Sequence, residues 1–119
     1  MNLEEIRRYC ISKPEVTEEF PFDSSTLAFK IFGKIFLLTD VDHFESINVK
    51  CDPEKSIELR EKFDTILPGF HMNKKHWITV KSVGPYFNKD IFSWIDHSYE
   101  LVLKKIPAKD RTASQKFQF

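Results

Sequence analysis

The stretch LAFKIFGKIFLLTD at residues 27–40 decides the fold class of this chain. Leu27 and Phe29 point to one side while the residues between them point to the other, which is the two-residue period of a half-buried β-strand. Gly33-Lys34 then supplies a tight turn, and KIFLLTD runs back as a second strand. The stretch therefore predicts an antiparallel β-hairpin.

Further strands follow on both sides of this hairpin. SINVKC at residues 46–51 predicts a third strand that completes an antiparallel meander, and HWITVK at residues 76–81 predicts a fourth strand. Residues 18–22 contain FPF, where Pro21 offers no N–H to a neighbouring strand. We expect at most a short edge strand there.

Three helices are predicted around the strands, at residues 2–13, 52–65 and 88–107. Asn2, Asp52 and Asn88 precede them, and each has a side chain that can cap the first turn. Pro107 ends the last helix. The order α-β-β-β-α-β-α predicts an α+β fold: a single two-layer domain with an antiparallel sheet and helices on one face.

The chain has 119 residues, which suffices for one domain with its own core. We expect this domain at residues 1–108 and a short polar tail at residues 109–119. The tail is either disordered or docked onto the domain through Phe117 and Phe119.

Composition and cysteine usage indicate the compartment. The longest apolar run is far shorter than the roughly 20 residues that cross a bilayer, and the N-terminus is charged rather than signal-like. Cys10 and Cys51 lie far apart without a CxxC motif. We expect two reduced, buried thiols in a cytoplasmic protein.

Charge is balanced in total but uneven along the chain. Eighteen basic residues face 18 acidic ones, yet residues 65–84 carry three lysines and no acid, and residues 103–119 carry five basic residues against Asp110 alone. If these two segments meet in the fold, they form a positive patch. Alternatively, the tail lysines interact with the carbonyl end of a helix or with water.

The first basic segment contains PGFHMNKKHW at residues 68–77. His71 and His76 are too few for a metal site, and the adjacent Lys74 and Lys75 would repel a cation. We therefore predict no metal. Lysine, histidine and asparagine in one loop suit contact with phosphates.

Enzymatic chemistry and bound cofactors are not indicated. Ser98 lies beside His97 and Asp96, but consecutive helical residues point about 100° apart and cannot form a triad. The three glycines lie in separate turns and make no phosphate-binding loop. We predict no catalytic residue and no cofactor.

Three stretches together resemble one family. EEFPF at residues 18–22 leading into FKIFGKIFLL, PGFHMNKKHWITV at residues 68–80 and HSYELVLKKIP at residues 97–107 are similar to the MmcQ/YjbR family of small bacterial proteins. The resemblance covers nearly the whole chain, with Phe70 where tyrosine is common. It implies a frataxin-like or secretion-chaperone-like α+β architecture, which has been likened to a double-wing DNA-binding domain, and it implies no shared catalytic residue.

The resemblance also indicates which residues belong to the motifs of the family. The loop contributes the motif residues Pro68, Gly69, His71, Asn73, Lys74, Lys75, His76 and Trp77, and the last helix contributes Ser98 and Tyr99. Pro68, Gly69, Trp77, Ser98 and Tyr99 have a structural reading. In it, Trp77 and Tyr99 pack the loop against the last helix, and Asn73 bonds its own backbone.

The function predicted from these features is non-enzymatic, weak and non-specific DNA binding by a monomer. The expected contact residues are Lys74, Lys75, His71, Asn73, His76, Lys81, Lys104 and Lys105. The alternative is a protein-binding adaptor whose sheet face exposes a patch of Phe32, Phe36 or Phe44. A third reading is a small-molecule or enzymatic role in a groove beneath PGFHMNKKHW.

Overall fold

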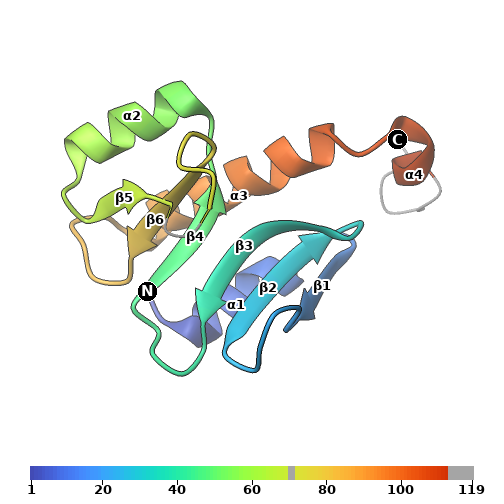
Figure 1. The fold of residues 1–119 in the computed structure, drawn as a ribbon, viewed down its shortest axis with the longest axis horizontal. Helices are drawn as coiled ribbons and strands as arrows, with labels where there is room; N and C mark the ends of the chain where they lie inside the picture. The colour runs from blue at the N-terminus through green and yellow to red at the C-terminus, as the bar shows by residue number, and fades with distance from the viewer. Residues whose placement is uncertain (70–71, 113–119) are drawn as a thin grey trace.

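The hairpin at residues 27–40 forms part of a six-stranded sheet in which every neighbouring pair of strands is antiparallel (Figure 1). The computed structural model describes residues 1–69 and 72–112. Their order along the chain is α1 (Leu3–Ile11), β1 (Val16–Glu19), β2 (Thr26–Ile31), β3 (Lys34–Asp40), β4 (Ser46–Lys50), α2 (Pro53–Lys62), β5 (Ile66–Pro68), β6 (Trp77–Lys81), α3 (Asn88–Lys104) and α4 (Ala108–Thr112). Across the sheet the order is β1-β2-β3-β4-β6-β5.

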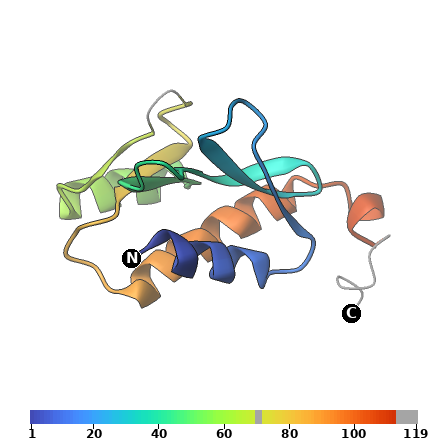
Figure 2. The ribbon, with the colours of Figure 1, turned by 90° about the horizontal axis from the view of Figure 1, so that it is seen from below.

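The sheet and the helices form two layers. Helices α1 and α3 lie on one face of the sheet (Figure 2), and α2 runs along the edge strand β5. The predicted α+β class is therefore confirmed. The strands β1 and β5 extend the four predicted strands at the two edges of the sheet.

The two edge strands depart from the sequence prediction for different reasons. The strand expected near residues 18–22 is β1, which pairs with β2 from Val16 to Glu19. The FPF motif lies beyond it, with Phe20 50% and Phe22 67% exposed, so FPF is not the strand. β5 was not predicted, because three residues are too few to show a period.

The central turn is shifted by one residue from the prediction. Ile31 pairs with Lys34, so the loop is Phe32-Gly33 rather than Gly33-Lys34. Phe32 has φ 49° and Gly33 has φ 78°, as a type I′ hairpin turn requires. Phe32 packs against the core, which helps to hold an aromatic residue in a conformation that favours glycine.

The helix boundaries agree with the predicted caps and ends except at two places. The side chains of Asn2 and Asp52 cap α1 and α2 as predicted. Asn88 does not cap α3: the cap is Phe87, whose backbone N–H donates to the Asp90 carboxylate at 2.9 Å. Helix α2 ends at Lys62 rather than near residue 65.

The core lies between the sheet and helices α1 and α3. It consists mainly of aliphatic side chains, with Phe29 and Phe36 as its fully buried phenylalanines in the described residues. Phe32 and Phe44 are half-buried against this core, so Phe32, Phe36 and Phe44 do not form the exposed patch that the adaptor reading expected. Within the described residues, no helix has the length and apolarity needed to cross a membrane.

The predicted domain boundary falls beside a short helix. Residues 109–112, expected as part of the tail, belong to α4. The rest of the tail, including Phe117 and Phe119, lies outside the described residues, so its docking stays a prediction.

Candidate functional site

The sheet opens between β3 and β4. The two strands pair only at three positions, from Leu37 with Val49 to Thr39 with Ile47. Beyond Leu37 they diverge, and α3 is visible behind the gap (Figure 1). The backbone groups at the opening therefore need partners that the strand ladder does not supply.

Ser98 supplies these partners. Its hydroxyl donates to the carbonyl oxygen of Phe36 at 2.5 Å and accepts from the N–H of Lys50 at 2.8 Å. Ser98 is fully buried, so no water competes for these bonds. The small side chain lets α3 approach the sheet closely, and it also bridges the two separated strands.

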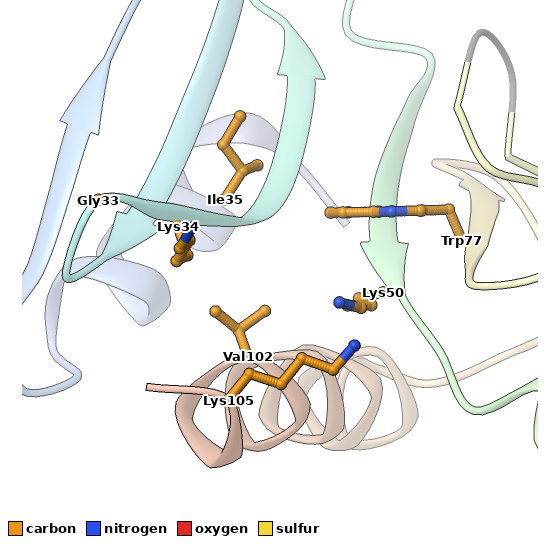
Figure 3. Close-up of a pocket in the computed structure, with 7 residues that line it drawn as sticks. All are labelled: Gly33, Lys34, Ile35, Lys50, Trp77, Val102 and Lys105. Carbon is orange, nitrogen blue, oxygen red and sulfur yellow. The ribbon is translucent and has the colours of Figure 1, made fainter. Parts of the chain in front are cut away.

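A cavity of about 510 Å³ lies at the opening, and we call it the split-sheet cleft. It lies between the turn at the start of β3, the facing ends of β4 and β6, and the end of α3. The residues that line it are Gly33, Lys34, Ile35, Lys50, Trp77, Val102 and Lys105 (Figure 3). Three ammonium groups and one indole thus share one cavity.

The lysines of the cleft lack acidic partners. Among the residues that the structure describes, Lys34, Lys50 and Lys105 form no ion pair, whereas Lys13 and Lys30 pair with Asp96 and Glu19. Burial lowers the pKa of Lys50, and the positive charge of Lys105 lowers it further. An anion bound between these two lysines would relieve their repulsion.

The backbone positions Trp77 at the cleft. Trp77 pairs with Lys50 across β4 and β6, and its carbonyl oxygen accepts from the N–H of Gly69 at 2.9 Å. A Cβ at position 69 would lie 2.7 Å from the Trp77 Cβ, so this contact requires glycine. In Figure 3 the Trp77 side chain extends across the gap toward β3.

The loop before Trp77 is held by its asparagine. The side-chain oxygen of Asn73 accepts from the N–H of Lys75 at 3.0 Å. The backbone carbonyl oxygen of Asn73 accepts from the N–H groups of His76 and Trp77. The structural reading of Asn73 is therefore confirmed. Lys74 and Lys75 are exposed on this turn.

Trp77 of the first basic segment and Lys105 of the second both line the cleft, whereas the lysines of the first segment are not among its lining residues. Lys104 is exposed next to Lys105 at the end of α3. Lys81, in contrast, lies at the other end of β6, about 13 Å from Trp77 along the strand. The predicted contact His71 lies outside the described residues.

Other motif residues have structural roles. The Tyr99 hydroxyl donates to the Pro14 carbonyl oxygen at 2.8 Å, and its ring packs edge-on against Phe36. Tyr99 therefore packs α3 against the connection between α1 and β1 rather than against the 68–77 loop, contrary to the structural reading. Pro68 ends β5, opposite Ile78.

His97 bonds to the backbone at the start of α2. Its Nε2 accepts from the N–H of Asp52 at 3.2 Å, which requires a neutral ring. Burial, together with the nearby positive charge of Lys55, lowers the pKa of His97 and favours this neutral form. His97 thus helps to fix the start of α2.

Metal-binding and nucleophilic groups do not gather in the described part of the chain. There, no group of three or more His, Cys, Asp or Glu residues could hold a metal ion. Cys10 and Cys51 are buried, and burial raises the pKa of their thiols to about 12 and about 11. Such thiols carry little thiolate at neutral pH.

Lys34 and Lys50 were missed as candidate residues. Each is a single lysine in a strand with alternating apolar residues, which usually means a solvated position. Only the register that places Lys50 opposite Trp77, and the divergence of β3 from β4, bring them into one cavity.

Comparison with known proteins agrees with this structure. The YjbR family model matches residues 11–101. The uncharacterized protein YbdF of Escherichia coli O157:H7 is 35% identical over 112 residues, which cover 91% of this chain and 89% of that protein. The uncharacterized protein YjbR of Escherichia coli K12 is 27% identical over 112 residues, covering 93% and 95%.

Solved structures give the same result. The crystal structure of Deinococcus radiodurans protein DR2400 superposes with a TM-score of 0.88 at 35% identity, covering 94% of this chain and 86% of that one. A crystal structure of a Pseudomonas syringae protein, target PsR293, gives a TM-score of 0.73 at 30% identity, covering 86% and 99%. The family resemblance noted in the sequence is confirmed, and the chain belongs to the YjbR family.

Proposed function

We propose that this protein is a non-enzymatic DNA-binding protein that contacts phosphates through the split-sheet cleft and the adjoining basic loop. The observation that carries the proposal is the convergence of Lys34, Lys50 and Lys105 on one cavity without an acidic partner in the described residues. Lys74 and Lys75 extend the positive surface from the neighbouring turn.

The distribution of charge supports this proposal. The chain has a formal net charge of zero, so its positive charge is effective only where lysines gather without acids. Lysine ammoniums contact phosphates as point charges and carry little sequence information. Weak and non-specific binding follows, with dissociation constants in the range of roughly 10⁻⁴ to 10⁻⁶ M. The double-wing mode of binding, the monomeric state and the cytoplasmic location belong to the same proposal.

The test is fluorescence anisotropy of a labelled DNA duplex titrated at several salt concentrations. If about four phosphates are neutralised, log affinity falls against log salt with a slope near −3.6. The variants Lys74→Ala/Lys75→Ala and Lys50→Ala/Lys105→Ala should each bind roughly tenfold more weakly and reduce the slope by about two.

The matched control is Lys62→Ala/Lys89→Ala, which removes the same charge elsewhere. Both residues are exposed, and Lys89 lies about 24 Å from Lys105 along α3. The control should bind like the wild type. A DNA affinity that does not change with salt concentration would count against the proposal. So would a control variant that weakens DNA binding as much as the cleft variants do.

The adaptor alternative has less support. Its predicted patch is absent, because Phe36 is buried and Phe32 and Phe44 pack against the core. If no nucleic acid binds in the titration, the sheet face without helices becomes the next surface to test.

A further inference from the structure

We propose that the split-sheet cleft binds one unpaired nucleotide, with its phosphate between Lys50 and Lys105 and its base against Trp77. The inference rests on the proposed function and deepens it. The preferred ligand is then single-stranded nucleic acid, or an unpaired base within a duplex, rather than an intact duplex.

The first support is the combination of groups in the cavity. Single-strand binding proteins combine a positive groove for the backbone with aromatic side chains on which bases stack. Here Lys50 and Trp77 are paired residues of adjacent strands, and Lys105 reaches the same cavity from α3. Figure 3 shows the indole edge-on, with the ends of Lys50 and Lys105 on the side of one of its faces.

The second support is the shape of the site. A volume of about 510 Å³ lies within the range of small-ligand pockets, roughly 300 to 1,000 Å³. In a duplex each base is paired and stacked, so its face cannot reach a side chain inside such a cavity without being extruded. An unpaired base meets no such cost.

The third support is the chemistry of the remaining walls. Ile35 and Val102 give the cavity an apolar side that suits a sugar or a base edge. Lys34 also lines the cleft, and Lys74 and Lys75 are exposed on the turn that precedes Trp77, so these lysines are the candidates for contact with neighbouring phosphates of a strand. The cleft therefore has a place for each part of a nucleotide.

The experiment uses Trp77 as its own reporter. The chain has two tryptophans, and Trp94→Phe leaves Trp77 as the single one; Trp94 is buried against Phe63 and Tyr86. This variant is titrated with a twelve-residue oligothymidylate, with a duplex of equal length and with an abasic oligonucleotide of equal length. The emission intensity and the fluorescence anisotropy of Trp77 are both measured.

We expect the oligothymidylate to bind about tenfold more tightly than the other two probes and to quench Trp77 emission. Trp77→Ala should weaken binding of the oligothymidylate about tenfold, which is at the low end of the effect expected when a stacking contact is lost. The same variant should leave the affinity for the duplex within twofold of the wild-type value. Trp77→Phe should retain part of the affinity, and its circular dichroism spectrum shows whether the fold is intact.

The outcomes separate the inference from the proposed function. Equal, salt-dependent binding of all three probes without quenching would overturn the inference and leave phosphate binding standing. Equal binding of the abasic and thymidine strands would likewise overturn the role of Trp77. Absence of binding to every probe at low salt would overturn both.

Discussion

At the scale of single residues, Ser98 takes over part of a strand ladder. Its hydroxyl contacts one backbone group on β3 and one on β4, at the place where these strands no longer pair. The neighbouring Tyr99 and His97 also bond to backbone groups, of Pro14 and Asp52. In this chain, the side chains of His97, Ser98 and Tyr99 therefore join α3 to distant backbone segments.

Ser98→Ala should destabilise the fold by about 2–3 kcal/mol, because it removes the partner of the buried Phe36 carbonyl and of the half-buried Lys50 N–H, and a fully buried group without a partner costs roughly 1–3 kcal/mol. Urea denaturation gives the free energy of unfolding. The control is Ser93→Ala on the exposed side of the same helix, where the hydroxyl bonds only to the Asp90 carbonyl in the described residues. We expect a change below about 0.5 kcal/mol for Ser93→Ala. Equal losses for both variants would contradict the bridging role.

At the scale of elements, the β5–β6 pair determines the position of Trp77. β5 is only three residues long, yet it continues into the contact between the Gly69 N–H and the Trp77 carbonyl oxygen. The close approach of these two backbones leaves no space for a side chain at position 69. A short edge strand thus controls one wall of the cleft.

Gly69→Ala should displace Trp77, because the new Cβ would lie 2.7 Å from its Cβ and 3.1 Å from its backbone. We expect a destabilisation of about 1–3 kcal/mol, as in other overpacked sites, and weaker binding to the oligothymidylate. The emission maximum of Trp77 in the Trp94→Phe background reports the displacement. An unchanged emission spectrum and unchanged stability would show that the neighbouring backbone adapts without cost.

At the scale of the whole molecule, the net charge is zero, but the paired and unpaired charges lie in different parts of the fold. Carboxylates pair with Arg7, Arg8, Lys13 and Lys30 on and around α1, β1 and β2. The lysines of the cleft have no such partners in the described residues. The fold therefore keeps positive charges close together at the one place where we propose that an anion binds, which should lower its stability.

Lys50→Met should stabilise the protein by about 0.5 kcal/mol at pH 7, the size of exposed charge-pair effects, while it weakens nucleic-acid binding. The folded-state pKa of Lys50 is lowered, so between that pKa and 10.5 the unfolded state binds more protons, and wild-type stability rises with pH. The advantage of Lys50→Met should therefore shrink as pH approaches 10.5. Urea denaturation of both proteins at pH 7 and pH 10 measures this difference.

The comparison variant is Lys30→Met, which removes an ammonium that lies 2.7 Å from the Glu19 carboxylate. This variant should lose stability at pH 7, because it leaves a carboxylate without its partner. If Lys50→Met also loses stability, the lysines of the cleft do not repel one another.

Much of the fold could be predicted from particular residues. The alternation from Leu27 to Ile31, the turn chemistry at Gly33 and the caps Asn2 and Asp52 act within a few positions, so they are visible in the sequence. The helix cap at Phe87 could not be predicted, because the side chain that forms the cap is that of Asp90 and not that of Phe87 itself. β5 was missed because its three residues are too few to show a period, and only its pairing with β6 defines it as a strand.

The sequence by itself determined the α+β class, most element positions and the basic character of the loop at residues 68–77, because periodicity, capping and charge are local properties. Only the tertiary structure decided that Lys34, Lys50, Trp77 and Lys105 share one cavity. Their meeting depends on the register of β4 with β6, on the divergence of β3 from β4 and on the approach of α3 at Ser98. These are contacts between residues far apart along the chain, and they form only when the whole core packs.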